Sequence, residues 1–245
     1  MKLSFEIGTA TMSGSAHPYQ DRYLNGTDAK EKRMLFAVAD GVTYSMSRFG
    51  DGAVAAEAAV GLLRDTDSGL KLSDAVRDVH RKIVEMKRYV PTIGETTIVA
   101  AKITGNVVEI ANVGDSPAHL LRNGRMRRLY TPDLGAFGGL TQMLGYDDRI
   151  RVHERSVKAQ PDDIFMLASD GLMKSIKSYI WPKNDKNMGK YVTRSILTSN
   201  DIREIVNGNK FLHIAAEEII KEASRKRPDI NDDRTVVIIR ALRAD

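Results

Sequence analysis

The sequence predicts an α+β fold in which mainly antiparallel strands and several helices form one domain. Three observations lead to this prediction: strand-like alternation fills the first 40 residues, two helical patterns follow, and a series of strands joined by short turns comes next. These elements do not form a repeated strand–helix–strand unit. A doubly wound parallel sheet is therefore not expected.

The N-terminal third predicts strands and then two helices. Residues 5–9 alternate as in a half-buried strand, and residues 34–39 (MLFAVA) form a short apolar run. Residues 52–63 carry Ala and Leu at helical spacing, and a second helix is predicted over 73–88 with Ser73 as its N-cap. The apolar stripe of this second helix consists of Ala75, Val79, Ile83 and Met86.

The rest of the chain predicts hairpins, one clear helix and a closing strand. Residues 95–130 contain the runs TTIVAAKI, VVEIANV, AHLLR and RMRRLY, and the links TGN and RNG read as turns in which Gly adopts a positive φ. The remaining predicted elements are strands at 151–157 and 163–168, a turn with a short helix at 169–177, an amphipathic helix at 211–224 and a strand at 235–241.

Composition excludes several classes of protein. The chain has 245 residues and a net charge of +5, too small an excess among 37 basic and 32 acidic residues to indicate nucleic-acid binding. Cysteine is absent, which excludes disulfide scaffolds, thiol catalysis and thiolate metal sites. No apolar run is long enough for a membrane span or a secretory leader. We expect a cytoplasmic protein with no membrane contact.

Aspartates recur where apolar strands end. Asp40 follows MLFAVA, Asp115 follows EIANVG, Asp170 follows IFMLAS, and Asp232 precedes the last strand, while Asp21 lies in PYQDR. An Asp-Gly pair after a strand is also a common turn, and that interpretation stays open for each position alone. Several carboxylates that converge unpaired would be costly, so the pattern favours a cation site.

The charges of such a site balance with two divalent ions. The four negative charges come from Asp21, Asp40, Asp170 and Asp232. Oxygen ligands without Cys or clustered His favour Mg²⁺ or Mn²⁺ over zinc. Residue patterns alone therefore predict a carboxylate metal site and no particular reaction.

Seven segments, in order, resemble the metal-dependent protein phosphatase (PPM) family, the type 2C serine/threonine phosphatases. They are PYQDRYL (18–24), FAVADGV (36–42), GETTIVAAKI (94–103), ANVGDSPAHLLRNG (111–124), LTQMLG (140–145), DDIFMLASDGL (162–172) and DDRTVVII (232–239). The resemblance implies a central β-sandwich of two mainly antiparallel sheets flanked by helices. It implies a single phosphatase-like domain over residues 1–245.

The resemblance also implies a role for each aspartate, with two Mn²⁺ or Mg²⁺ ions per site. Asp40 would bridge the ions, with the Gly41 carbonyl as a further ligand. Asp170 and Asp232 would bind the first ion, and Asp21 would bind the second or orient its water molecules.

Other family positions are expected to be auxiliary. Asp115 matches a residue linked to a third, weaker metal, together with Asp170. Asp233 stands where Asn is more usual, and we expect it to hydrogen-bond the site rather than ligate. The structural positions expected to shape the sandwich are Gly94, Thr96, Thr97, Asn112 and Gly114.

Two departures concern phosphate binding and proton donation. The family usually has Arg five residues before Asp21 to hold the substrate phosphate, whereas this chain has Ala16. The candidate replacements are His17, Arg22 and Arg48. No His follows the Asp40–Gly41 pair, so the general acid stays unassigned.

Two segments differ from the family in length. The flap is short, over residues 131–139, and should leave the site open. An insertion over residues 174–210 is long and contains Trp181. It either covers an edge of the site or docks a partner, or it is a mobile surface insertion.

The expected function is hydrolysis of phosphoserine and phosphothreonine in proteins, by a water or hydroxide that bridges two divalent metals. Partners would be phosphoproteins, including a serine/threonine kinase. The alternative is a pseudophosphatase, a weak or inactive member kept as a binding module. Ala16 and the missing His favour the alternative, and the retained aspartates favour the enzyme.

Overall fold

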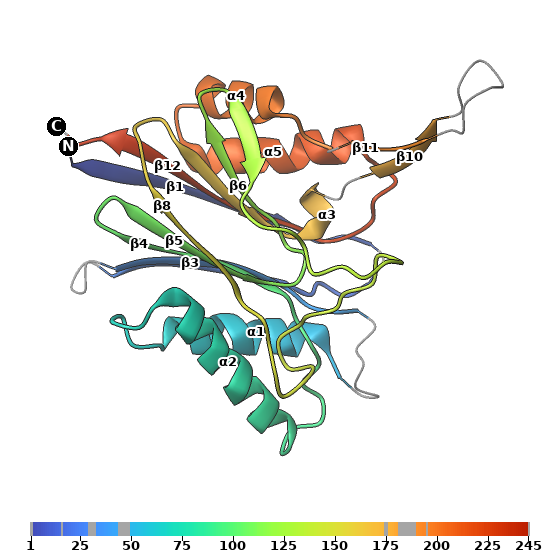
Figure 1. Ribbon diagram of the computed structural model, residues 1–245. Coiled ribbons are helices and arrows are strands. Elements are labelled where there is room, and N and C mark those ends of the chain that lie inside the picture. Colours follow the sequence, from blue (N-terminus) through green and yellow to red (C-terminus); the bar gives the residue numbers. More distant parts are fainter. Residues whose placement is uncertain are drawn as a thin grey trace.

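Two antiparallel sheets face each other, and helices cover their outer faces (Figure 1). The computed structural model of the chain describes residues 2–15, 17–28, 33–43, 50–173, 176–180, 190–194 and 196–244. Within these residues each of the two sheets has five strands. The predicted α+β sandwich flanked by helices is confirmed.

One sheet has the strand order β1-β12-β9-β6-β7, and its first and last strands in the chain are paired along their whole length. Its strands are β1 (Leu3–Met12), β6 (Ala118–Arg122), β7 (Arg125–Arg128), β9 (Ile164–Ala168) and β12 (Arg234–Arg243). The β6–β7 hairpin turns through Asn123 and Gly124, both with positive φ, as the RNG motif predicts.

The other sheet has the order β2-β3-β4-β5-β8. Its strands are β2 (Asp21–Asp28), β3 (Arg33–Asp40), β4 (Ile98–Thr104), β5 (Val107–Val113) and β8 (His153–Lys158). Gly105 supplies the positive φ of the β4–β5 turn. A separate two-stranded ribbon pairs β10 (Ile176–Ile180) with β11 (Lys190–Arg194).

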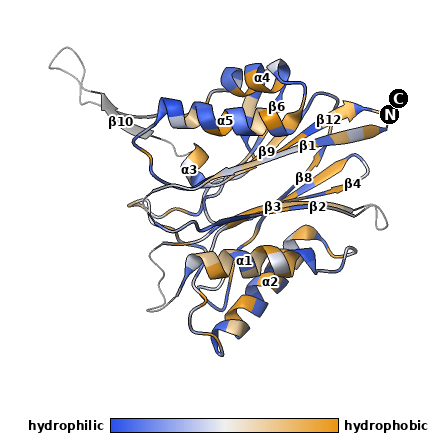
Figure 2. Ribbon diagram, turned by 180° about the vertical axis from the view of Figure 1, so that it is seen from behind, coloured by the Kyte–Doolittle hydropathy of each residue, from blue (hydrophilic) through white to orange (hydrophobic). Residues whose placement is uncertain are grey.

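Apolar side chains fill three layers. Phe36 and Phe165 are fully buried between the sheets. Helices α1 (Gly52–Arg64) and α2 (Leu72–Lys87) pack on the β2-β3-β4-β5-β8 sheet, and α4 (Ser199–Gly208) and α5 (Leu212–Lys226) cover the other sheet. Figure 2 shows the apolar faces of these helices turned towards the strands. Such burial is the main contribution to stability.

Helix α2 differs from its prediction at both ends. Its N-cap is Lys71, which makes no side-chain capping bond, and Ser73 is instead buried inside the first turn. The buried face of the helix ends at Ile83, so Met86 is 37% exposed. The Ser73 cap was therefore wrong, and Met86 of the predicted stripe lies beyond the buried face, because a 3.6-residue period does not reveal where a helix leaves the sheet it covers.

The polar stretch near residue 200 contains a helix that periodicity missed. Helix α4 buries only Ile202 and Val206, too few apolar positions to produce a clear stripe. Its visible signal is a capping box, in which Thr198 accepts a bond from the Asp201 N–H and the Asp201 side chain accepts one from the Thr198 N–H. Part of the predicted 174–210 insertion, including Trp181, lies outside the described residues.

Short helix α3 (Asp170–Met173) follows β9 directly, as predicted for the turn after that strand.

Within the described residues, no helix has both the length and the apolar character needed to span a bilayer. Residues 131–139 form a loop, and its Leu134 forms an isolated bridge with Leu140, just after the loop.

Candidate metal centre

A cavity of about 800 Å³ opens at the end of the sandwich where the aspartate-bearing strand ends meet. Asp40 ends β3, Asp115 follows β5, Asp170 follows β9, and Asp232 precedes β12. All four line this cavity, as does Gly41. The fold thus brings together residues that are up to 192 positions apart (232 − 40).

Asp21 and Asp40 are direct neighbours across two antiparallel strands. Asp21 is the first residue of β2, and the strand register places it opposite Asp40. Gly41 then lies against the start of α1. A Cβ atom at Gly41 would lie 2.4 Å from the Gly52 carbonyl group, so no larger residue fits beside Asp40 without moving the helix.

Hydroxyl groups hold the backbone around Asp40. The Asp40 carbonyl accepts bonds from the Thr97 N–H and the Thr96 hydroxyl, each at 2.9 Å. The Thr97 and Ser116 hydroxyls are 2.6 Å apart, and the Asn112 side-chain amide donates to the Ser116 carbonyl at 3.0 Å. This chain of bonds links the end of β3 to the loop that carries Asp115. The geometry supports the structural role expected for Thr96, Thr97 and Asn112.

Asp170 and Asp232 come from paired strands. Ala168 at the end of β9 pairs with Val236 in β12, so the residues beyond these positions emerge side by side. A Cβ atom at Gly171 would lie only 2.1 Å from the Asp233 carbonyl oxygen. Glycine at position 171 therefore allows the two aspartate-bearing segments to touch.

Asp233 holds the backbone next to the site in place through hydrogen bonds. Its carboxylate accepts hydrogen bonds from the backbone N–H groups of Gly14 at 2.7 Å, Gln20 at 2.6 Å and Asp21 at 3.3 Å. The residue is 2% exposed and does not line the cavity. These bonds match the expectation that Asp233 hydrogen-bonds the site instead of ligating.

The cluster brings carboxylates of like charge close together. Burial raises the pKa of Asp21 to about 7; the nearby Thr235 and Ser169 hydroxyls oppose this effect, and the Asp233 and Asp170 charges add to it. Burial also raises the pKa of Asp40, as do the charges of Asp21, Asp170, Asp232 and Asp115, in that order. The other four predicted carboxylates therefore lie within electrostatic range of Asp40.

The residues present fit a divalent cation. Asp21 is fully buried, and neither of its carboxylate oxygens has a hydrogen-bond partner. A buried orphan carboxylate beside further carboxylates is the environment that a cation compensates. The donors are all oxygen atoms, which suits Mg²⁺ or Mn²⁺. Among the described residues, no three carboxylate or imidazole groups enclose an ion as they stand, so binding requires these side chains to reorient.

His17 is the substrate-binding candidate that lines the cavity. Its Nε2 atom is 3.1 Å from Asp232 Oδ1, and its Nδ1 atom is 3.0 Å from the Pro18 carbonyl oxygen. Burial alone would lower the pKa of His17. The bonds to Pro18 and Asp232 and the nearby Asp233 charge outweigh burial and raise it. His17 therefore adds positive charge at the edge of an acidic cavity.

The two arginine candidates are placed differently. Arg22 does not line the cavity, and its guanidinium group is engaged elsewhere. It bonds Glu57 Oε2 at 2.7 Å and the Asp21 carbonyl at 2.8 Å, and it lies over the Tyr19 ring. Arg48, like Ala16, lies outside the described residues. Of the described candidates, the geometry favours His17 over Arg22.

Some cavity residues had no individual prediction. The flap contributes Gly138 and Gly139, and Asn231 precedes Asp232. Met143 lies within the LTQMLG motif, which was recognised as a family segment and not as a lining segment. Gly138 has a positive φ. The adjacent glycines at 138 and 139 were the one signal in the sequence that the backbone of the flap approaches the cavity closely.

Comparison with known sequences identifies one family. A family model described as Protein phosphatase 2C matches residues 8–210. The serine/threonine phosphatase Stp of Listeria innocua is 31% identical over 176 residues, covering 58% of this chain and 68% of the relative. Stp of Listeria monocytogenes strain EGD-e is 30% identical over 175 residues with the same coverage.

Solved structures share the fold across nearly the whole chain. The serine/threonine phosphatase of S. agalactiae has a TM-score of 0.75 at 21% identity, covering 97% of this chain and 99% of its own. The catalytic domain of the phosphatase PstP, solved with two manganese ions, has a TM-score of 0.72 at 21% identity and covers 98% of this chain. At this level of identity the match concerns the fold alone.

Proposed function

The chain belongs to the protein phosphatase 2C family, and on that premise we propose that it hydrolyses phosphoserine and phosphothreonine in proteins with two divalent cations. One observation carries the proposal. Asp40, Asp115, Asp170 and Asp232 converge on one cavity, and the orphan carboxylate of Asp21 lies beside Asp40. A binding module that had lost its metals would gain nothing from this charge, which destabilises the fold when it is uncompensated.

The proposed assignment follows the positions of the side chains. Asp40 would hold both cations, because it lies among all the other carboxylates. Asp170 and Asp232 would complete the first position, and Asp21 the second, with the Gly41 carbonyl as a further ligand. Asp115, with Asp170, would hold a third, weaker cation. Bound Mn²⁺ or Mg²⁺ would activate a water molecule for in-line attack and offset the charge of the phosphoryl oxygens.

The residues around the carboxylates have proposed tasks of their own. His17 would bind a phosphate oxygen at the edge of the cavity, in place of the arginine that Ala16 replaces. Asp233 would keep the backbone of Gln20 and Asp21 in place through its three hydrogen bonds. Two-cation chemistry needs no enzyme nucleophile, which agrees with the absence of Cys from the sequence.

Phosphoproteins are the proposed substrates, as the names of the Listeria relatives suggest for those proteins. The proposed partner is a serine/threonine kinase that generates the same phosphoresidues, and the cytoplasm is the proposed location. A pseudophosphatase is the competing interpretation, and the first experiment separates the two.

The test is release of phosphate from an aryl phosphate and from a phosphothreonine peptide, with EDTA, Mg²⁺ or Mn²⁺. We expect activity that requires metal and falls about a hundredfold or more in Asp40→Asn and in Asp170→Asn, because each substitution removes a charged ligand. Asp67→Asn, at an exposed aspartate between α1 and α2, is the matched control and should leave activity unchanged.

Calorimetry of Mn²⁺ binding completes the experiment. Tight, Asp40-dependent metal binding without turnover on any phosphopeptide would favour the pseudophosphatase. Activity that persists in EDTA would exclude the proposed role of the aspartates.

A further inference from the structure

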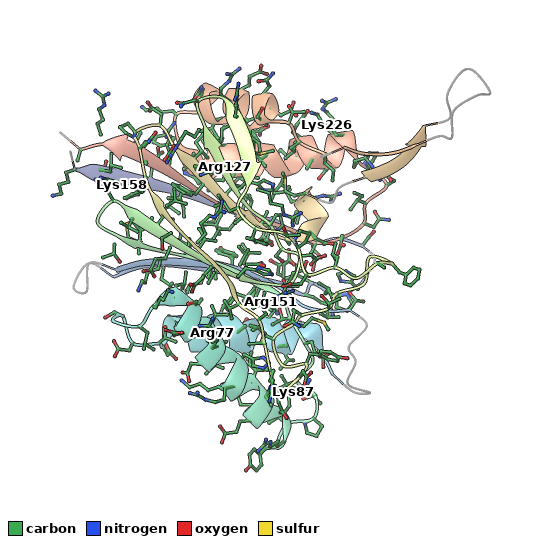
Figure 3. The ribbon with its side chains drawn as sticks, viewed as in Figure 1. Arg77, Lys87, Arg127, Arg151, Lys158 and Lys226 are labelled. Atoms are coloured by element: carbon green, nitrogen blue, oxygen red, sulfur yellow. The ribbon has the colours of Figure 1, made fainter. Side chains whose placement is uncertain are left out.

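A second cavity of about 560 Å³ lies between α2 and the loop that leads into β8. It is separate from the carboxylate cavity and shares no lining residue with it. Figure 3 labels Arg77 on α2, on the outer side of the helical layer. The charged lining residues are Arg77, Arg81, Arg88, Arg149, Glu85 and Asp148.

Two of the four arginines in this cavity form no ion pair with the described residues, although Glu85 and Asp148 also line it. Arg77 pairs with Asp74 at 2.6 Å, and Arg81 pairs with Asp78, in each case with an acidic residue of the preceding turn. Arg88 and Arg149 form no ion pair in the described part of the chain, and both are exposed. Two guanidinium groups therefore remain available for a ligand.

A buried imidazole group lies at the wall of this cavity. His80 is 3% exposed, and its Nδ1 atom accepts a hydrogen bond from the Gly145 N–H at 3.2 Å. Burial lowers its pKa, although the backbones of Asp147 and Asp148 oppose this effect. Because Nδ1 accepts this bond, the neutral ring carries its proton on Nε2, and this N–H, although near the Asp147 and Asp148 backbones, forms no hydrogen bond of normal geometry with the described residues.

We propose that this cavity binds a phosphate-type oxyanion, held by Arg88 and Arg149 with the Nε2–H of His80 as a donor behind them. Guanidinium groups are suited to bidentate binding of phosphate, and a buried unsatisfied N–H is a donor that an anion satisfies. Because Nε2 is covered, the arginines make the first contact, and the anion reaches the imidazole only if the 146–149 loop moves.

The cavity is connected to the carboxylate site through one short segment. Residues Leu140 and Met143 line the carboxylate cavity, and Arg149 lines the arginine cavity. Between them, Lys87 at the end of α2 donates to the Gly145 carbonyl at 2.7 Å and to Glu95 at 2.6 Å. An anion held at α2 would therefore sit against the same loop that borders the proposed catalytic cavity.

Two ligands carry the phosphate group that this cavity would bind. One is a second phosphorylated residue of a protein substrate, and the other is free inorganic phosphate. The substrate source rests on the proposed function, whereas binding of the anion itself does not. The experiment therefore has one arm that needs no catalysis and one arm that does.

The first arm titrates inorganic phosphate into the full chain in EDTA, at constant ionic strength set with chloride, and follows backbone amide resonances of residues 145–149. Without metal the carboxylate cavity repels phosphate, so a signal there is not expected. We expect saturation in the wild type and about tenfold or more weaker binding in the Arg88→Ala/Arg149→Ala double variant, from loss of two charged hydrogen-bond donors.

The matched control removes two other exposed arginines. Arg125→Ala/Arg127→Ala changes the net charge equally, on β7 at the opposite side of the molecule, where Figure 3 labels Arg127. Its phosphate affinity should equal that of the wild type. Shifts that do not saturate, or that weaken equally in both double variants, would overturn the proposal, because they would reflect net charge alone.

The second arm uses the metal-loaded enzyme and compares peptides with one and with two phosphoserines. If the cavity binds a second phosphoresidue of the substrate, the wild type prefers the doubly phosphorylated peptide. The Arg88→Ala/Arg149→Ala variant then loses this preference and keeps its activity on an aryl phosphate. If the site holds free phosphate, the preference is unaffected and the effect of added phosphate on turnover disappears. An enzyme inactive on every substrate would contradict the proposed function and leave the first arm intact.

Discussion

Asp21 and Asp233 are both buried carboxylates in the same site, yet their environments are opposite. Asp233 accepts three backbone hydrogen bonds, whereas the oxygens of Asp21 accept none. A carboxylate whose acceptors are filled stabilises the fold, and one whose acceptors are empty remains available to a cation. The same residue type therefore serves two purposes, and only the surroundings distinguish them.

Replacement of Asp233 should destabilise the fold before it affects chemistry. Asp233→Ala leaves buried N–H groups of Gly14, Gln20 and Asp21 without an acceptor, which should cost about 3 kcal/mol of unfolding free energy. Asp233→Asn keeps one acceptor oxygen and should cost less. Urea denaturation measures both, and equal stability of Asp233→Ala and wild type would rule out this bracing role.

His17→Ala separates two roles for the histidine. If His17 binds the substrate phosphate, KM for a phosphopeptide should rise about tenfold, the typical effect of losing a hydrogen bond to a charged group. If His17 only positions Asp232, to which its Nε2 atom is bonded, metal affinity should fall and turnover should recover at saturating Mn²⁺. We expect the change in KM. The two results are read from the same titration of substrate and metal.

Among the elements, α4 depends on its cap more than on its core. It buries only Ile202 and Val206, and Asp201 joins its capping box to α5 through an ion pair with Lys226 at 2.6 Å. A helix with so small an apolar face gains a large share of its stability from its termini.

Thr198→Ala should therefore lower the free energy of unfolding by about 1 kcal/mol, because the Asp201 N–H loses its side-chain acceptor. Ser199→Ala, one residue further into the helix, is the control and should change stability by much less. Thermal denaturation of both variants tests this. Equal effects would mean that the Thr198 hydroxyl does not cap the helix.

Strands and helices with strong periodicity were predicted within a few residues. The apolar run at 34–39 became β3, and the clear stripe at 211–224 became α5. Helix α4 was not found because it has few buried positions, and β2 received no bounds of its own within the strand-like first 40 residues because it has few apolar residues. The cap at Ser73 was wrong because Ser caps a helix only from the residue that precedes the first turn, and here the helix begins at Leu72, so Ser73 lies inside it.

For the whole molecule, the charge of the cavity couples stability to pH and to metal. In the metal-free protein the pKa of Asp21 is about 7, against an ordinary value of 3.8. Between about pH 4 and pH 7 the folded state therefore keeps a proton that the unfolded state has released, so this group's contribution to stability falls as pH rises. Divalent cations, if they bind as proposed, should reverse the loss by compensating the ionised carboxylates.

We expect Mn²⁺ to raise the melting temperature more at about pH 7.5 than at about pH 5, since protonated carboxylates bind cations poorly. Melting curves in EDTA and in excess Mn²⁺ at the two pH values measure this difference. Asp21→Asn should reduce it, and Asp67→Asn should not. An equal effect of Mn²⁺ at both pH values would show that the buried carboxylates do not form its binding site.

The sequence by itself determined the class of fold and the residue types at the site. Alternating and apolar runs specify strands because a side-chain period is a local property, and aspartates at strand ends were visible for the same reason. The motif order pointed to the family that the comparison then identified. None of this required knowledge of which strands pair.

Only the tertiary structure decided which of these groups meet. Strand register places Asp21 opposite Asp40, and it places Arg22 where it bonds Glu57. Helix packing buries His80 in a cavity that Arg88 and Arg149 also line. These contacts join residues distant in the chain, and local sequence carries no record of them. The physical reason is that pairing and burial are properties of the whole chain, because they minimise exposed apolar surface and unsatisfied polar groups together.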